Sequence, residues 1–205
     1  MKTSNEPLIL LIAGCVMLAI TAINPHDYTT WWLETFPIFI ALPILVATYR
    51  RYSLTPLVYR LLFVHATILM VGGHYTYAEV PLGYWMEDWF GFARNNFDKI
   101  GHLAQGFVPA MLFRELLLRS SPLRQGKLLF VLVAASCLAV SASYELIEWA
   151  AAVNMGQSAD AFLGTQGDQW DTQSDMLMAL IGAISAQLML AKMQDSQLGN
   201  RGQTT

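Results

Sequence analysis

Charge is what this sequence has least of. Only 13% of its 205 residues are charged, whereas a soluble domain carries about a quarter, so a basic nucleic-acid-binding module is excluded. Two cysteines are too few for a disulfide-stapled secreted scaffold, and 55% hydrophobic residues are too many for a disordered chain. The mean hydropathy is +0.40. These values indicate a protein whose solvent is the lipid bilayer, with no nucleic acid as partner.

Long apolar runs fill the sequence. A helix that crosses a bilayer needs roughly 20 mostly apolar residues. Runs of about this length occupy residues 8–23, 31–49, 57–73, 100–118, 128–149 and 175–191. Lys2 precedes the first run, but no small-x-small cleavage site follows it, so we expect a retained helix rather than a signal peptide. We predict an all-α polytopic membrane protein, a bundle of about six transmembrane helices within 1–193, followed by a polar, flexible tail at 194–205.

The few charges are unevenly placed. If the helices alternate in direction, nearly all Lys and Arg residues fall on one side of the membrane, and only Arg94 and Lys99 fall on the other. Because short loops rich in Lys and Arg stay in the cytoplasm, we expect both termini there. Most acidic residues fall on the outer side, together with the longer loops 74–99 and 150–174. These loops are rich in aromatic residues and glycine, which favours ordered structure.

Polar side chains recur at helical spacing near the outer ends of three predicted helices. The first stripe runs i, i+3, i+7 and i+10, and it comprises Asn95, Asp98, His102 and Gln105. The other two stripes lie at the ends of the fifth and sixth runs and comprise Glu145 and Glu148, and Asp168, Asp171 and Asp175. We predict that these stripes share one depth on one side of the membrane.

This combination of side chains is suited to three kinds of chemistry. Carboxylates with an imidazole bind divalent metals such as Mg, Mn or Zn. His102 could act as a general base beside Glu145 or Glu148 as acid, and the same groups could relay protons or cations. The candidate catalytic residues are His102, Asp98, Glu145, Glu148, Asp171 and Asp175. Candidate substrate-binding residues are His74, Tyr75, Asn95, Gln166, Asp168 and Trp170, and a metal, if present, would take its ligands from His102, Glu145, Glu148, Asp171 and Asp175.

Each feature also has a purely structural interpretation. Asp168 could cap the sixth helix, Asp98 and His102 could satisfy each other, and Glu148 could mark an interfacial helix end. His65, in the middle of a run, favours an interhelical hydrogen bond over a ligand role. A face of small residues indicates helix packing and comprises Ala179, Gly182, Ala183 and Ala186. Arg114 and Glu115 could either snorkel toward the inner membrane surface or pair with each other near it.

Four segments carry a family resemblance: Gly72–Pro81, Arg94–Phe107, Tyr144–Trp149 and Phe162–Met176. In them, and across most of its length, the sequence resembles the YjdF-like proteins of the bacterial inner membrane, a family without an assigned activity. A weaker, distant resemblance to VanZ-like membrane proteins rests on Asp98, Lys99 and His102, a later helix-end glutamate, and the spacing of Asp171 and Asp175. The resemblance implies a multi-pass protein of the bacterial inner (plasma) membrane.

Three functions remain open on these grounds. A protein that binds or modifies a lipid-linked or envelope substrate requires the polar stripes to converge in one outward-facing site. A small transporter or a proton or cation pathway requires the polar track to continue inward, past His65 toward Arg114 and Glu115. A non-catalytic partner in an envelope complex would instead use its aromatic outer loops as a contact surface.

Overall fold

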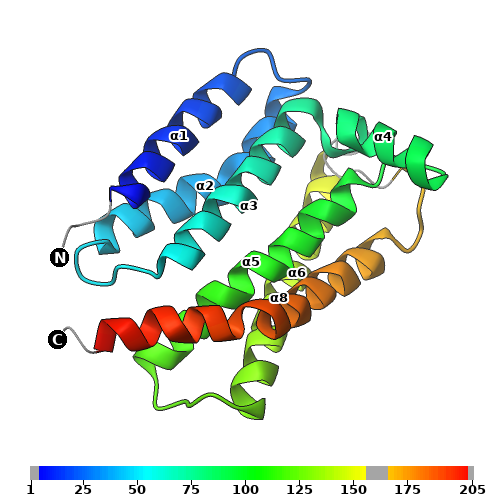
Figure 1. Ribbon diagram of the computed structural model, residues 1–205. Coiled ribbons are helices and arrows are strands. Elements are labelled where there is room, and N and C mark those ends of the chain that lie inside the picture. The colour runs from blue at the N-terminus through cyan, green and yellow to red at the C-terminus, as the bar shows by residue number, and fades with distance from the viewer. Residues whose placement is uncertain (1–4, 156–165, 203–205) are drawn as a thin grey trace.

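Helices account for nearly all of the chain. The computed structural model describes residues 5–155 and 166–202, and within these ranges it contains no strand, which confirms the all-α fold class. The elements are shown in Figure 1 and are α1 (Glu6–Thr21), α2 (Tyr28–Thr48), α3 (Pro56–Tyr75), the 3-10 turn η1 (Tyr77–Glu79), α4 (Pro81–Phe90), α5 (Phe97–Ser120), α6 (Lys127–Met155) and α8 (Asp171–Gly202).

Four of these helices, α2, α3, α6 and α8, are long and apolar enough to cross a membrane. The other two predicted spans differ from them. Helix α1 is apolar but has only 16 residues, and α5 has 24 residues but is less apolar. Helix α5 packs against α3, α6 and α8, so its polar groups face protein rather than lipid. Passage of α1 and α5 through the bilayer therefore stays a prediction.

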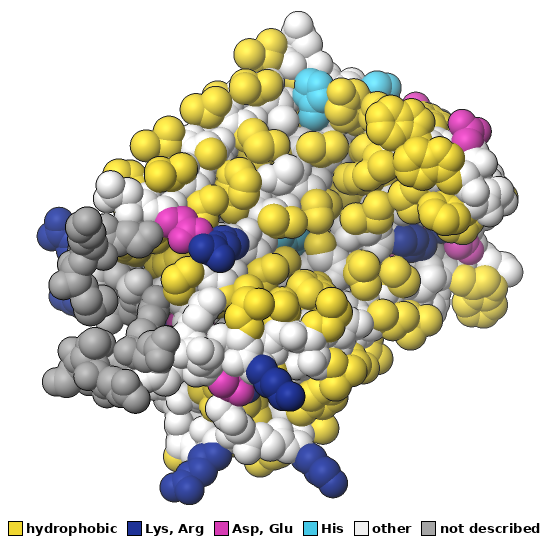
Figure 2. All heavy atoms as spheres, in the orientation of Figure 1, with side chains coloured by type: hydrophobic (Ala, Val, Ile, Leu, Met, Phe, Trp, Pro, Cys, Tyr) yellow, Lys and Arg dark blue, Asp and Glu magenta, His cyan; other side chains and the backbone are white. Residues whose placement is uncertain are grey.

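The helices form two groups joined through α3 and α5. Helices α1 and α2 both pack on α3, while α6 and α8 both pack on α5, and α3 contacts α5. The start of α1 and the end of α8 lie at the same end of the bundle, and the short helix α4 lies at the opposite end (Figure 1). Apolar side chains spread over much of the face in Figure 2. Lys and Arg side chains project at its lower edge, near the loop between α5 and α6 in Figure 1, and others lie at its left edge and among the apolar side chains.

Helices α5 and α8 approach each other closely because glycine stands at both sides of the contact. A Cβ atom on Gly106 would lie 1.7 Å from the carbonyl oxygen of Ala179, and one on Gly182 would lie 2.1 Å from that of Leu103. Ala179 and Ala183 beside them are fully buried. The prediction that this small-residue face packs against another helix is confirmed. Backbones at this distance gain van der Waals contact that larger side chains would prevent.

The loop at 74–99 is ordered, as its aromatic content predicts. It forms η1 and α4, and α4 ends at Gly91, whose φ of 68° is the left-handed conformation that glycine adopts readily. Trp85 and Trp89 are exposed on α4. The hydroxyl of Tyr84 donates to Glu79 at 2.5 Å, and this hydrogen bond raises the pKa of Tyr84 to about 12.

Helix α8 continues through residues 194–202, where the sequence predicts a flexible tail. The Gln194 amide donates to the carbonyl of Met111 at 2.7 Å, and Asp195 forms an ion pair with Arg114 at 2.7 Å. The side chain of Gln197 accepts a hydrogen bond from the backbone N–H of Leu57. These three polar side chains of the predicted tail therefore bind partners on α3 and α5. Residues 203–205 of the predicted tail lie outside the described residues.

We expect Gly182→Ala to destabilise the protein, because the new methyl group would meet the backbone of α5 rather than a side chain that can move. Overpacking of this kind costs about 1–3 kcal/mol. The measurement is the thermal unfolding midpoint of the purified protein in detergent. Gly199→Ala on the same helix is the matched control, since nothing lies within 4 Å of its added Cβ. Equal midpoints for the two variants would contradict the close contact.

Candidate functional site

The contact between α5 and α8 places the first predicted stripe against the third. We call the resulting group the His102 cluster. It combines side chains that precede or belong to α5 with side chains of α6 and of the start of α8, and it comprises Arg94, Asp98, Lys99, His102, Glu145, Asp168, Asp171 and Asp175. The cluster occupies the end of α5 nearer to α4.

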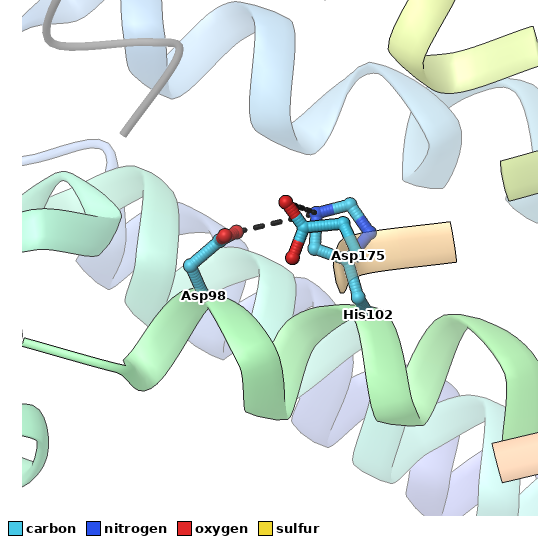
Figure 3. Close-up of side chains that lie close together, drawn as sticks. All are labelled: Asp98, His102 and Asp175. Carbon is cyan, nitrogen blue, oxygen red and sulfur yellow. Dashed lines mark ion pairs between the residues drawn. The ribbon is translucent and has the colours of Figure 1, made fainter. Parts of the chain in front are cut away.

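The imidazole of His102 lies between carboxyl groups from three helices. Its Nε2 atom is 3.3 Å from Oδ1 of Asp98, one helical turn earlier on α5, and 3.9 Å from Oδ2 of Asp175 on α8. Figure 3 shows these two carboxylates converging on the ring. The Nδ1 atom faces the other way, 3.2 Å from Oε1 of Gln105 and 3.8 Å from Oε1 of Glu145 on α6. The two ring nitrogens therefore have different surroundings.

Two cations hold the α8 carboxylates in place. The Lys99 ammonium is 2.8 Å from Asp171 and 2.6 Å from Oδ1 of Asp175. Arg94 is 2.6 Å from Asp171 and 3.0 Å from Asp168. Burial lowers the pKa of Arg94, but the hydrogen bond and charge of Asp171, with Asp168, outweigh it and leave the pKa raised. The two exceptions to the charge asymmetry of the sequence are thus the fixed cations of this cluster.

The cluster is buried and incompletely paired. The side chains of His102, Glu145 and Asp175 are 8%, 5% and 2% exposed. Two buried oxygens, Oδ2 of Asp98 and Oε1 of Glu145, have no hydrogen-bond partner among the described residues. Five carboxylates here face only two fixed cations. Buried carboxylates of this kind require a proton or a further cation.

Two predicted residues border the cluster without joining its centre. Glu148 is half-buried and makes no hydrogen bond or ion pair with another described residue. The Asp168 side chain accepts a hydrogen bond from the backbone N–H of Trp170, two residues later and just before α8, which is an Asx turn rather than a cap on a helical N–H, and its other oxygen pairs with Arg94.

Other predicted substrate-binding residues lie elsewhere. Asn95 precedes α5, which begins at Phe97, so it does not share the helical face that its spacing predicted. Its amide donates to Val80, and its oxygen accepts from the backbone of Phe97, which ties α4 to α5. His74 contacts the carbonyl oxygen of Thr21 at 3.0 Å, at the end of α1.

The remaining three candidates are exposed. Tyr75 packs its ring against His74, and Gln166 donates to the carbonyl of Asn95. Trp170 is 62% exposed.

Sequence reasoning missed Glu34 as a neighbour of this site. It is 4% exposed within α2, and the hydroxyl of Tyr144 on α6 is 3.4 Å from its Oε2 atom. The signal that could have identified it is a carboxylate inside an otherwise apolar run.

A second polar group, the Glu115 cluster, lies farther along α5 and comprises Thr55, Arg114, Glu115, Arg119, Gln194 and Asp195. Glu115 is fully buried and accepts from the backbone and hydroxyl of Thr55. About 18 Å of helix separates Arg114 from His102. Between them on α5 lie apolar side chains that are 2% exposed or less, including Val108 and Met111, while the buried amide of Gln187 on α8 donates to the carbonyls of Phe130 and Ala183.

His65 does not connect the two clusters. Its buried Nε2 atom has no hydrogen-bond partner among the described residues, so the interhelical bond expected for it is absent there. It borders an apolar cavity of about 660 Å³ between α1, α2 and α3, whose lining includes no residue of the His102 cluster.

Comparison with known proteins identifies a family and a relative of this chain. A family profile described as "Predicted membrane protein (DUF2238)" matches residues 6–196. The chain belongs to this family. It is also 51% identical to "Inner membrane protein YjdF" of Escherichia coli (strain K12), over 100% of both chains. No solved structure matches.

These findings make the chain a multi-pass integral protein of the inner membrane, embedded in the lipid bilayer, and confirm the YjdF-like resemblance. They do not bear on the weaker VanZ-like resemblance.

We expect Lys99→Met to destabilise the protein strongly, because it leaves the Asp175 carboxylate, which is 2% exposed, without its nearest cation. Loss of one partner of a buried pair costs about 3–5 kcal/mol. The double variant Lys99→Met, Asp175→Asn should recover part of that loss. The free energy of unfolding in mixed micelles is measured for the two single variants and for the double variant. If the loss in the double variant equals the sum of the losses in the two single variants within about 0.5 kcal/mol, the two side chains are not coupled.

Proposed function

We propose that this protein binds or modifies a lipid-linked or envelope substrate at the outer leaflet of the inner membrane, and that the His102 cluster is its site. The observation that carries the proposal is the convergence of an imidazole and carboxylates from three helices, with two buried carboxylate oxygens that lack a hydrogen-bond partner among the described residues. Side chains with a purely structural role are normally satisfied by hydrogen bonds. Groups left unsatisfied at one end of a bundle are available to a ligand.

The surroundings of the cluster favour a ligand that approaches from the membrane interface. Helix α4 lies at the same end of the bundle, and its exposed side chains include Trp85, Trp89 and Phe90. Tryptophan is enriched where membrane proteins meet lipid headgroups. A substrate with an apolar anchor would thus bring its polar part to the depth of His102.

The apolar layer between the His102 and Glu115 clusters argues against a transport pathway. A proton or cation moving between them would have to pass Val108 and Met111, which have no polar side-chain group, and the buried Gln187 bonds to backbone carbonyls of α6 and α8 rather than to either cluster. Such pathways use closely spaced polar groups or water within the membrane.

We further propose that both termini are cytoplasmic and that the His102 cluster faces the periplasm. The distribution of Lys and Arg supports this orientation. The start of α1 and the end of α8 lie at one end of the bundle, and α4 lies at the other (Figure 1).

A fusion to the C-terminus tests the orientation. Green fluorescent protein placed after Thr205 should fluoresce, and alkaline phosphatase at the same position should be inactive, because the first matures in the cytoplasm and the second in the periplasm. The junction has to follow Thr205, since an earlier one would remove the contacts of Gln194 and Asp195. Active phosphatase with dark fluorescent protein would reverse the proposed orientation.

Complementation tests the site itself. In a strain without the gene, lipid-linked envelope species measured by mass spectrometry should change, and wild-type protein should restore them. His102→Ala and Glu145→Gln should restore less than about a tenth of the difference, because catalytic and ligand-binding groups typically contribute tenfold or more. Asp88→Asn, an exposed acid on α4, is the matched control and should restore the wild-type pattern.

Two results would contradict the proposal. Full restoration by both cluster variants at wild-type abundance would remove the His102 cluster from the function. If, in addition, Trp85→Ala and Trp89→Ala failed to restore, the aromatic face of α4 would be the functional surface, as expected for a partner in an envelope complex.

A further inference from the structure

We propose that the His102 cluster is a divalent metal site, in which Zn²⁺ or Mn²⁺ is bound by His102 Nε2 and by carboxylate oxygens of Asp98 and Asp175. The inference deepens the proposed function and rests on it, because it names what the same cluster holds. It depends on the geometry of the ring, on the pairing of its second nitrogen and on the charge of the cluster.

The three ligand atoms are already close together. Those offered by Asp98, His102 and Asp175 lie within 4.8 Å of one another. Metal–ligand bonds of about 2.0–2.2 Å allow two ligand atoms to be at most about 4.4 Å apart. The distances from Nε2 to Asp98 and to Asp175, 3.3 and 3.9 Å, meet this limit. The third pair of ligand atoms, one carboxylate oxygen each from Asp98 and Asp175, is no more than 4.8 Å apart, which is within about 0.4 Å of this limit.

The opposite side of the ring is arranged as it is around metal-bound histidines. Such a histidine usually donates its second N–H to a carboxylate or carbonyl oxygen, which fixes the tautomer and the ring orientation. Here Nδ1 faces the Gln105 amide oxygen at 3.2 Å and the Glu145 carboxylate at 3.8 Å. With the proton on Nδ1, the lone pair of Nε2 points between Asp98 and Asp175.

Glu145 supplies an independent indication. Its side chain is 5% exposed, and its Oε1 atom has no hydrogen-bond partner among the described residues although it points at the His102 ring. A buried carboxylate is costly in this state. A metal on Nε2 would make the Nδ1–H more acidic and a stronger hydrogen-bond donor, and so would draw the Glu145 oxygen toward the ring.

The charge of the cluster points the same way. Lys99 uses the Oδ1 atom of Asp175, which leaves Oδ2 facing His102. Oδ2 of Asp98 is 3.8 Å from the same ammonium, too far for a hydrogen bond. The remaining negative charge suits a doubly charged ion. One imidazole with two carboxylates is a ligand set intermediate between those typical of zinc and of manganese.

The test is direct metal binding by the full-length protein. The chain is purified in detergent without a histidine tag, stripped with EDTA, and titrated calorimetrically with Zn²⁺ and Mn²⁺, with Mg²⁺ for comparison. Bound metal is counted by mass spectrometry after desalting. We expect one ion per chain, and Co²⁺ in the same site should give a visible absorption band from its coordination.

Variants locate the ion. His102→Asn and Asp175→Asn should abolish stoichiometric binding and the Co²⁺ band. Glu145→Gln should weaken binding about 10–100-fold, as loss of a hydrogen bond to a metal-bound histidine does. Asp88→Asn should bind as the wild type does. The thermal midpoint of each stripped variant shows whether it is folded.

Two outcomes would overturn the metal site: a wild-type chain that binds no stoichiometric ion, or binding that both His102→Asn and Glu145→Gln leave unchanged. These outcomes are separable from failure of the proposed function. If wild-type protein binds no metal but His102→Ala still fails to restore the envelope species, only the metal inference falls. If metal binds and that variant restores them, the metal site stands and the proposed function falls.

Discussion

The contact between α5 and α8 at Gly106 and Gly182 determines how the rest of the molecule is arranged. Helix α5 carries more polar side chains than a lipid-facing helix tolerates, and its neighbours α3, α6 and α8 enclose it. Glycine at both sides lets the two backbones approach until each carbonyl leaves no room for a Cβ on the other helix. The same approach fixes the register in which Asp98 and His102 on α5 meet Asp175 on α8.

The backbone contact between α5 and α8 also determines which charged side chains of the two helices meet. Lys99 and Arg94 reach across the same interface to Asp171, so the polar end of the α5–α8 pair is held by ion pairs and its middle by close packing. At the other end Arg114 meets Asp195. The pair thus has charged contacts at both ends and a small-residue centre, so that oppositely charged side chains inside the protein lie close to one another.

Sequence spacing predicts much of this arrangement. Residues three or four apart on one helix share a face, so spacing alone groups Asp98 with His102, and Asp171 with Asp175. The small-residue face of α8 likewise indicates a packed interface. Spacing does not give the rotation of α5 against α8, and for that reason it does not predict the pairing of Lys99 and Arg94 with the α8 acids. The spacing wrongly places Asn95 on the helical face of His102. Its side chain instead bonds to backbone groups just before α5 begins, and such local hydrogen bonds cannot be predicted from periodicity.

The length of α8 has a consequence for how the protein is made. Arg114 is 6% exposed, and its partners Gln194 and Asp195 are synthesised about 80 residues after it, once α6 has been made. Until then its guanidinium lacks these two partners within a helix that depends on its neighbours for enclosure. Helix α5 can therefore reach its final position only after the second half of α8 has been synthesised, and a truncation that removes Gln194 and Asp195 would leave the buried guanidinium without these partners.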